Sequence, residues 1–322
     1  MTDHERTSFI NPEYPFQREK IPVTNGVEGF KDFIDRYPDF AFCPYVAEKD
    51  EEGWDKSTSR VYMNQVLPRF LYVPVNISKG DNVELRNFFE FVKNHENIPA
   101  VNITQPHKSS AVLRELFLGD PNSDLNVDTL IRGYEGMLEP YDLNSTAFVE
   151  WYKDEVGSFQ DRQVVLVGVG GVGEPIAKKI AAKRPQSMIL TDLEDKADFA
   201  RDLSLATQVD VRFTSSLGQM LEEGLPSDLV VINAAGKEGA VNESELIDLI
   251  REGTNGGVFV DIRPHLDIPI VQEAEGRGWQ AYTGHGMNAR NDFVLLQGIA
   301  AQLPGSTPPA FERFQQLVAQ AS

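Results

Sequence analysis

A glycine-rich turn in the middle of the chain has the residue types and the spacing to bind a dinucleotide. Residues 164–167 are apolar and mostly β-branched, as in a buried strand, and a G-x-G-x-x-G pattern follows them. One glycine makes the tight turn, one lets backbone N–H groups approach a pyrophosphate, and one lets the next helix pack on the strand. That helix begins with free N–H groups and a partial positive charge. The residues expected to contact the cofactor are Gly168, Gly170, Gly171, Val172 and Gly173.

An acid at the end of the next predicted strand indicates which dinucleotide binds. Residues 187–191 are typical of a strand, and Asp192 follows them. A carboxylate at this place accepts both ribose hydroxyls of an adenosine and repels a 2′-phosphate. The next arginine along the chain is Arg201, which is too distant to form a phosphate clamp. We therefore expect NAD rather than NADP; the alternative is that Asp192 caps a helix that begins near Leu193.

A lysine upstream of the glycine turn could move a proton. Residues 102–108, Asn-Ile-Thr-Gln-Pro-His-Lys, run from a predicted strand over residues 99–104 toward a predicted helix. Oxidation of a secondary alcohol needs a hydride acceptor and a base for the hydroxyl proton. Lys108 at such a turn can exchange that proton, and its ammonium can stabilise the oxyanion that develops in reduction. The alternative is a solvated lysine at the start of a helix.

The same segment resembles the N-V-T-x-P-x-K motif of the shikimate dehydrogenase family, and other segments resemble motifs of this family in the same order. Residues 57–64 resemble S-x-S-P-x-x-H-N, and the glycine turn resembles G-x-G-G-x-G. Residues 228–234 resemble D-L-x-I-N-A, and residues 261–264 resemble the start of D-x-x-Y-x-P. The resemblance covers residues 38–303.

The resemblance implies an oxidoreductase in which Lys108 is the acid–base group. It also implies that Ser57 and Ser59 hold a substrate carboxylate, while Asn102 and Thr104 bind its hydroxyls. A glutamine on the closing helix, Gln297, would contact the substrate as well. The turns after the later strands add the cofactor-binding candidates Asn233, Ala234, Ala235 and Asp261.

The chain departs from the family pattern around the substrate. Alignment of Phe148 with the end of the family's N-T-D-G-x-G-F motif puts Asn144 where the catalytic aspartate is expected. An amide can orient a lysine or a substrate but cannot share a proton, and Asp142 is the alternative source of a carboxylate. Arg60 and Met63 also replace a proline and a histidine of the family. The substrate is therefore not determined by the resemblance.

The order of the predicted elements indicates an α/β fold with two domains. Strands alternate with helices on both sides of the glycine turn, and 322 residues suffice for two domains. We expect an open α/β substrate domain, a Rossmann dinucleotide-binding domain, and C-terminal helices that return to the N-terminal domain. The expected boundaries are an N-terminal arm over residues 1–30, the substrate domain over 31–150, the Rossmann domain over 151–288 and the closing helices over 289–322.

Composition narrows the class of protein. The 49 acidic and 30 basic residues give a formal charge of -19, which disfavours nucleic acid and anionic membranes as partners. A single cysteine, Cys43, excludes a disulfide framework and a cysteine-built metal site. Neither a signal segment nor a run of membrane-spanning length is evident. We expect a cytoplasmic protein without a metal, monomeric or homodimeric, whose partner is a small molecule.

Together these features predict hydride transfer between NAD(H) and a small hydroxylated carboxylic acid or its keto form. Two alternatives stay open. One is a non-catalytic or regulatory dinucleotide-binding protein, because the catalytic aspartate is missing. The other is a reductase of a specialised pathway with a substrate other than shikimate.

Overall fold

The chain forms two compact units. The computed structural model describes residues 21–55, 59–121, 123, 126–218, 220, 228–235, 243–253, 257–264 and 267–321. Unit 1 comprises Met1–Leu143 and Asn291–Ser322, and unit 2 comprises Asn144–Arg290. The two α/β units and the return of the C-terminal helices to the first unit confirm the fold class predicted from the sequence.

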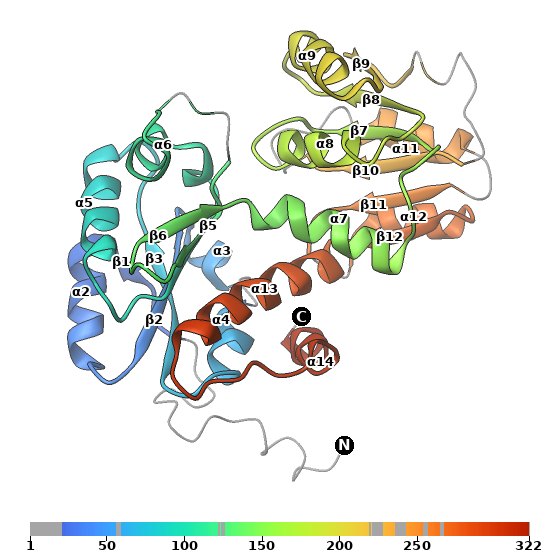
Figure 1. The fold of residues 1–322 in the computed structure, drawn as a ribbon. Coiled ribbons are helices and arrows are strands. Elements are labelled where there is room, and N and C mark those ends of the chain that lie inside the picture. Colours follow the sequence, from blue (N-terminus) through green and yellow to red (C-terminus); the bar gives the residue numbers. More distant parts are fainter. Residues whose placement is uncertain are drawn as a thin grey trace, which may run out of the picture. The chain divides into compact units, whose positions relative to one another are not determined.

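Unit 1 is built on a six-stranded sheet in the order β1-β3-β2-β4-β5-β6 (Figure 1). The first four strands in this order pair in parallel, whereas β5 and β6 form an antiparallel hairpin at the edge. The strands are β1 (Thr24–Asn25), β2 (Ala41–Ala47), β3 (Phe70–Asn76), β4 (Ala100–Ile103), β5 (Thr129–Arg132) and β6 (Leu138–Tyr141). The helices are α2 (Gly26–Arg36), α3 (Glu51–Asp55), α4 (Ser59–Tyr62), α5 (Asn82–Lys93), α6 (Ala111–Leu118) and α14 (Phe311–Ala321), with 3-10 turns at Met63–Gln65 and His107–Ser109.

The two faces of this sheet differ in chemistry. Alternate residues of a strand point to opposite faces. One set, which includes Phe42, Val73 and Ile103, packs with the apolar sides of α2 and α5 in a single core. The other set, which includes Tyr45, Tyr72 and Asn102, therefore points to the opposite face, which we call the polar face.

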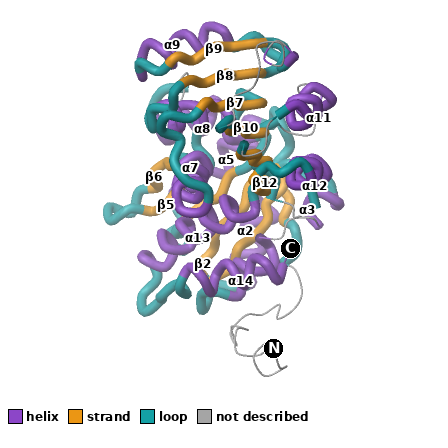
Figure 2. The backbone as a smooth tube through the Cα atoms, turned by 90° about the vertical axis from the view of Figure 1, so that its right-hand side faces the viewer, coloured by secondary structure: helices purple, strands orange, loops and turns teal. Residues whose placement is uncertain are grey.

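Unit 2 is a doubly wound sheet in the order β12-β11-β10-β7-β8-β9, with all neighbours parallel. Figure 2 shows β9, β8, β7 and β10 side by side. The strands are β7 (Gln163–Val167), β8 (Ser187–Thr191), β9 (Asp210–Thr214), β10 (Val230–Asn233), β11 (Val258–Asp261) and β12 (Gln280–Thr283). The helices are α8 (Gly173–Ala181), α9 (Ala197–Thr207), α11 (Glu243–Glu252) and α12 (Pro269–Gly276), while α7 (Leu143–Glu155) and α13 (His285–Gln302) each run across a boundary between the units.

Two cores enclose the second sheet. On one face, Ile176 and Ile180 of α8 and Leu203 of α9 pack on the strands. On the other face, Leu249 of α11 and Ala274 of α12 do so. Because the strand order reverses between β7 and β10, their carboxyl ends lie at the point where such sheets bind ligands.

Backbone crowding explains two of the glycines that follow β7. Gly168 has a φ of +86°, and a Cβ there would lie 2.6 Å from the backbone nitrogen of Ala235. A Cβ on Gly173 would lie 1.8 Å from the carbonyl oxygen of Gly168. A Cβ on Gly170, in contrast, would meet no atom within 4 Å. Gly168 and Gly173 are therefore glycines because a side chain at either position would collide with neighbouring backbone. Packing gives no such reason for the glycine at position 170.

The structure differs from the expected elements in several places. The predicted boundary near residue 150 falls inside α7, and the units divide at Leu143 instead. Residues 24–30, expected in an arm, form β1 and the start of α2, because Val27 and Phe30 are buried in the core. The β5–β6 hairpin was not predicted. The rest of the expected arm, residues 1–20, lies outside the described residues.

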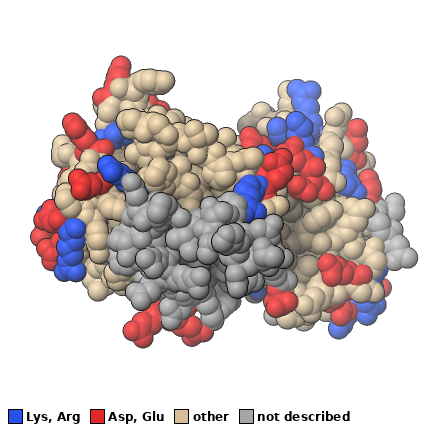
Figure 3. All heavy atoms as spheres, turned by 90° about the horizontal axis from the view of Figure 1, so that it is seen from below, with Lys and Arg blue, Asp and Glu red and all other residues tan. Residues whose placement is uncertain are grey.

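Figure 3 shows acidic and basic side chains interspersed over the described residues of one face. None of the helices in the described part of the chain is long and apolar enough to cross a membrane.

The contrast between the glycines can be tested with two matched substitutions. Gly173→Ala forces backbone to move, so we expect a loss of about 3 kcal/mol in the free energy of unfolding, or failure to fold. Gly170→Ala should leave the free energy of unfolding within about 0.5 kcal/mol of the wild type and weaken dinucleotide binding. Denaturant unfolding and NADH titration measure the two effects. Equal destabilisation by both substitutions would contradict this assignment.

Candidate active site

Lys108 lies just beyond the carboxyl end of a parallel strand. It belongs to the 3-10 turn His107–Ser109 that follows β4. Although it is a lysine, only 5% of its surface is exposed. Among the described residues, no group forms a hydrogen bond or ion pair with its ammonium. A buried lysine of this kind is suited to a reacting group rather than to a surface charge.

The neighbouring histidine anchors the turn. The His107 side chain is 3% exposed, and its Nε2–H donates to the carbonyl of Ile77 at 2.9 Å. Burial lowers the pKa of His107, so the ring is neutral above mildly acidic pH. His107 therefore holds the turn against the end of β3.

The polar face next to Lys108 carries hydroxyl, amide and thiol groups. Tyr45 of β2 lies opposite Asn102 of β4 in the sheet, and its ring stacks on Tyr72 of β3 at 5.4 Å. The Lys49 ammonium donates to the Tyr45 hydroxyl at 2.9 Å. Cys43 is fully buried on the same face, and burial raises the pKa of its thiol, so it is an inert neutral group.

A buried carboxylate that sequence analysis missed lies on this face. Asp292, in the part of α13 that belongs to unit 1, is 2% exposed. Its Oδ2 accepts hydrogen bonds from the Tyr62 hydroxyl and from Ser59 Oγ, the latter at 3.3 Å. Burial raises the pKa of Asp292 to about 6, although the bonds from Tyr62, Ser59 and Asn291 lower it. The one feature of the sequence that could have indicated Asp292 is its position in the helix after Gly286-Met287.

Two further polar atoms on these elements are buried without a hydrogen-bond partner in the described structure. They are Tyr72 Oη and Asn291 Oδ1. Asn64 fixes Tyr72 in place, since its side chain accepts from the Tyr72 N–H at 2.5 Å and donates to its carbonyl at 3.3 Å. Buried polar atoms usually have partners, so an orphan atom in a rigid frame indicates a place where a ligand or water binds.

A second missed acid holds the sheet edge. Asp128 is 1% exposed, and its Oδ1 accepts from the Thr129 hydroxyl and from the Leu143 N–H, both at 2.9 Å. Its backbone carbonyl accepts from the Ile103 N–H at 2.7 Å. Asp128 thus ties the end of β4 to the beginning of α7.

The predicted substrate-binding residues differ in their burial and in their contacts. Asn102 and Thr104 lie half-buried at the end of β4, and Ser59 joins Asp292. Gln297 is exposed on α13, five residues beyond Asp292 and so on another side of the helix. The buried amide of this helix is Asn291, which the sequence did not single out. Ser57 lies outside the described residues.

The two candidates for the missing aspartate lie at the start of α7. Asp142 directly precedes the helix, and Asn144 is in its first turn; both side chains are half-buried. Asp142 belongs to unit 1, as Lys108 does, whereas Asn144 belongs to unit 2. Both have interactions within the protein.

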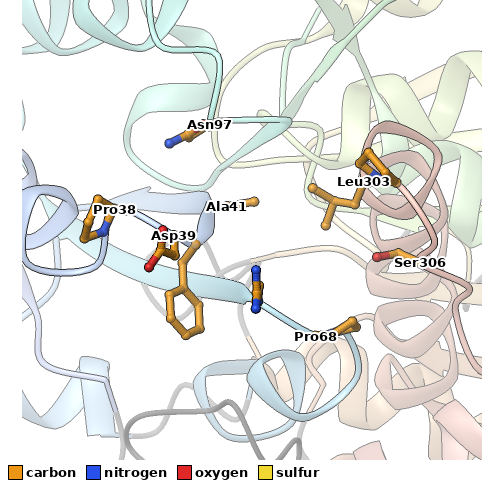
Figure 4. Close-up of a pocket in the computed structure, with 10 residues that line it drawn as sticks. Pro38, Asp39, Ala41, Pro68, Asn97, Leu303 and Ser306 are labelled. Atoms are coloured by element: carbon orange, nitrogen blue, oxygen red, sulfur yellow. The ribbon is translucent and has the colours of Figure 1, made fainter.

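A pocket at the opposite end of the first sheet does not belong to this group. It has a volume of about 450 Å³ and lies beside the residues that begin β2 and β3, such as Asp39, Ala41 and Pro68 (Figure 4). Ligands of open α/β sheets bind at the carboxyl ends of the strands. Lys108 follows such an end, so we set this pocket apart from the candidate site.

The glycine turn of unit 2 is fixed by the acid predicted to read the ribose. Asp192 Oδ2 accepts from the Val169 N–H at 2.5 Å, and Oδ1 accepts from the Glu194 N–H at 3.0 Å. Helix α9 begins only at Ala197, so Asp192 is not its N-cap. The two basic residues that follow are engaged: Lys196 pairs with Glu194, and Arg201 with acids of its own helix.

The turn fits a dinucleotide. Gly170 leaves the backbone open without a packing reason, and Val172, the N-cap of α8, has no side-chain capping bond. The Glu174 N–H already donates to the Gly170 carbonyl at 2.9 Å and Pro175 has no N–H, so the helix start itself offers a phosphate fewer donors than an ordinary first turn does. Gly171 and Gly173 lie in the same turn, and Ala234 and Ala235 lie beside it after β10.

Two other predicted cofactor residues bind each other. Asn233 Nδ2 donates to Asp261 Oδ2 at 2.8 Å, and Asn233 Oδ1 accepts from the Ala235 N–H at 3.2 Å. Asp261 is fully buried and forms a two-point ion pair with Arg263 at 2.7 and 2.8 Å. These side chains therefore fix the ends of β10 and β11 next to the turn. No group of residues that could hold a metal ion occurs in the described parts of the chain.

Comparisons with known proteins agree with the motifs and the fold. The shikimate dehydrogenase (NADP(+)) of Lysinibacillus sphaericus (strain C3-41) is 25% identical over 208 residues, which cover 64% of this chain and 74% of that protein. The quinate/shikimate dehydrogenase (NAD(+)) of Corynebacterium efficiens is 25% identical over 213 residues, covering 62% and 72%.

A solved structure and the family search complete the comparison. The shikimate 5-dehydrogenase of Listeria monocytogenes, in complex with shikimate and NAD, superimposes with a TM-score of 0.67 at 12% identity. That alignment covers 87% of this chain and 96% of the other. No protein-family model matches the chain. The ordered motifs and the curated relatives show that this chain is similar to shikimate and quinate/shikimate dehydrogenases, and the solved structure shows that it shares their fold.

Proposed function

We propose that the protein is an oxidoreductase that transfers hydride between NAD(H) and a small hydroxylated compound or its keto form. The observation that carries the proposal is Lys108, a buried lysine that follows the carboxyl end of β4 on a turn fixed by His107. The family relationship supports the reaction class, since the relatives are named as NAD(+)- and NADP(+)-dependent dehydrogenases.

Unit 2 binds the dinucleotide in this proposal. The turn at Gly168–Gly173 and the start of α8 hold its phosphates, and Asp192 accepts the adenosine ribose hydroxyls. The nicotinamide, when bound, supplies or accepts the hydride. Asn233 and Asp261 act indirectly, by fixing the loops that follow their strands.

Unit 1 binds the substrate and moves the proton. Asn102 and Thr104 hydrogen-bond its hydroxyls, and Ser59 contributes a further donor. Lys108 gives a proton to the carbonyl oxygen in reduction and removes the hydroxyl proton in oxidation. Asn144 or Asp142 orients the lysine. The protein acts in the cytoplasm, as a monomer or a homodimer.

The competing function is dinucleotide binding without catalysis, which the amide at Asn144 favours. The two functions differ in one readout, because a non-catalytic protein would bind NADH without oxidising it in the presence of any keto compound. Measurable turnover of any one substrate would show that the protein is an enzyme.

Replacement of the proposed acid–base group should abolish chemistry but not cofactor binding. We expect Lys108→Met to lower kcat by about 10²- to 10⁴-fold, because the proton then has no positioned donor. NADH titration should give an unchanged Kd. Lys31→Met is the matched control, since Lys31 lies on α2, over the opposite face of the sheet, and pairs with Glu28. Full turnover by the Lys108 variant would overturn the assignment.

Removal of the negative charge at Asp192 should reduce the preference for NADH over NADPH. Asp192→Asn keeps an oxygen that can accept from the Val169 N–H, so the turn should persist while the repulsion of a 2′-phosphate disappears. We expect the ratio of the two Kd values to fall by about tenfold or more. Asp195→Asn, which changes a nearby exposed acid, should leave the ratio unchanged. Tighter binding of NADPH by the unmodified protein would refute the choice of NAD.

A further inference from the structure

Lys49 places a positive charge at the carboxyl edge of the first sheet, and the proposed function does not use it. It follows β2, and its ammonium donates to the Tyr45 hydroxyl at 2.9 Å. We propose that Lys49 and Tyr45 bind a carboxylate of the substrate and thereby select an anionic hydroxy compound. This inference rests on the proposed function, because it assumes that the substrate binds at this edge of unit 1.

Aromatic rings hold the Lys49 ammonium in place. It lies 4.7 Å from the centroid of the Tyr45 ring and 5.0 Å from that of Trp54. These two rings meet edge to face at 5.6 Å, and Tyr45 also stacks on Tyr72 at 5.4 Å. The backbone is fixed as well, since the Lys49 N–H donates to Asn76 Oδ1 at 3.1 Å. A ligand therefore meets a preorganised cation, which loses little entropy on binding.

No carboxylate in the described part of the chain forms an ion pair with Lys49. Its acidic neighbours Glu48 and Asp50 are exposed, and Asp50 Oδ1 accepts from the Gly53 N–H at 2.7 Å. The groups that contact the half-buried ammonium, the Tyr45 hydroxyl and the two rings, are uncharged. An anionic ligand would therefore gain a charge pair here without displacing an acid of the protein.

The hydrogen bond between the two side chains directs their other protons toward a ligand. Tyr45 accepts from the ammonium, so its own hydroxyl proton can be donated elsewhere, and the ammonium keeps two further N–H groups. Hydrogen bonds from a charged donor to an ionised oxygen are stronger than those between neutral groups. A carboxylate has two such oxygens, one for the ammonium and one for the phenol. The pair is thus matched to a carboxylate better than to a hydroxyl or an ester.

Tyr45 lies next to a residue that is proposed to bind the substrate. It is directly opposite Asn102 in the parallel pairing of β2 and β4, so both side chains point to the polar face. Just beyond them, the Thr104 N–H donates to the Val46 carbonyl at 3.0 Å and keeps the two strand ends together. A compound whose hydroxyls bind Asn102 and Thr104 can therefore reach Tyr45 with another group.

Lys49 is also connected to the turn that carries Lys108. The carbonyl of Ala47, at the end of β2, accepts from the Ile77 N–H at 2.9 Å, and the Ile77 carbonyl binds the His107 ring at 2.9 Å. The two lysines thus follow neighbouring strands at one edge of the sheet. Lys108 is proposed to move the proton, and Lys49 to hold the anionic end of the same ligand.

The test uses two pairs of ligands that differ at the carboxyl group: shikimate with methyl shikimate, and quinate with methyl quinate. Equilibrium binding is measured in the presence of NADH, and hydride transfer is measured with NAD. The unmodified protein should bind at least one acid about tenfold or more tightly than its ester, because only the acid pairs with the ammonium. Lys49→Met keeps an apolar stem on the aromatic rings and should bring the ratio to within about threefold, by weakening the acid alone.

Two further variants separate recognition of the charge from packing. Tyr45→Phe keeps the ring under the ammonium and removes the hydroxyl, so the acid should bind about three- to tenfold more weakly and the ester should lose less. Lys31→Met is the control, because Lys31 also lies over an aromatic ring, 5.3 Å from the centroid of Phe91, but on α2, over the opposite face of the sheet. It should leave the ratio unchanged. A purely structural role of Lys49 would weaken the acid and the ester equally.

Three results would overturn the inference: neither acid bound more tightly than its ester by the unmodified protein, a ratio unchanged by Lys49→Met, or no binding of any member of the two pairs. Failure of the proposed function has a different signature. If the acids bind with the expected dependence on Lys49 and no hydride is transferred to or from any ligand, the selectivity stands and the catalytic proposal falls.

Discussion

Parallel pairing of strands is the constraint on which both units depend. In a parallel sheet every strand ends at the same edge, so side chains that follow different strands gather there although they are distant in sequence. Lys108 follows β4, and Lys49 follows β2, its neighbour in the first sheet. In the second sheet, the glycine turn follows β7, Asp192 follows β8, and the Ala234–Ala235 turn follows β10. Each unit thus assembles its own set of chemical groups at one edge.

Such an edge also exposes backbone and side-chain polar groups. In this structure, other residues of the protein form hydrogen bonds with them. Asp192 accepts from the backbone of the glycine turn, Asn233 binds Asp261, and Asp128 accepts from the first N–H of α7. These bonds hold the loops in place before a ligand arrives. A preorganised site loses less entropy on binding, which is why residues that do not touch the ligand still affect its affinity.

The sequence predicted the parts of this arrangement that are local. The glycine turn, the strand before it and the acid after β8 lie in one continuous segment, so their spacing alone indicates their geometry. The turn at Lys108 was predicted for the same reason. The β5–β6 hairpin was not predicted, because its strands are short and one contains Pro140. Asp292 was missed because its partners Ser59 and Tyr62 are far away in sequence, whereas Asp128 follows no motif that indicates its bond to Leu143.

The position of Gln297 shows a second limit of prediction from the sequence. A resemblance predicted an amide on the closing helix but not its place in the helix, and a shift of six residues moves a side chain by about 120° around the helix axis. Gln297 is exposed, whereas Asn291 lies buried beside Asp292. Helical position is decided by which side faces the sheet, and this requires the packing of Leu295, Leu296 and Ile299 to be known.

Asp292 reduces the stability of the fold. Its folded-state pKa of about 6 lies above the ordinary value of 3.8, so ionisation at neutral pH costs about 3 kcal/mol, a cost that disappears as the pH falls through 6 toward 4. A leucine or an asparagine at this position would avoid that cost. Proteins tolerate destabilising charges of this size mainly where function requires them. The hydroxyls of Ser59 and Tyr62 reduce the cost without removing it, and they hold the carboxylate toward the polar face of the sheet. The departures from the family pattern thus include a buried carboxylate as well as altered motif residues.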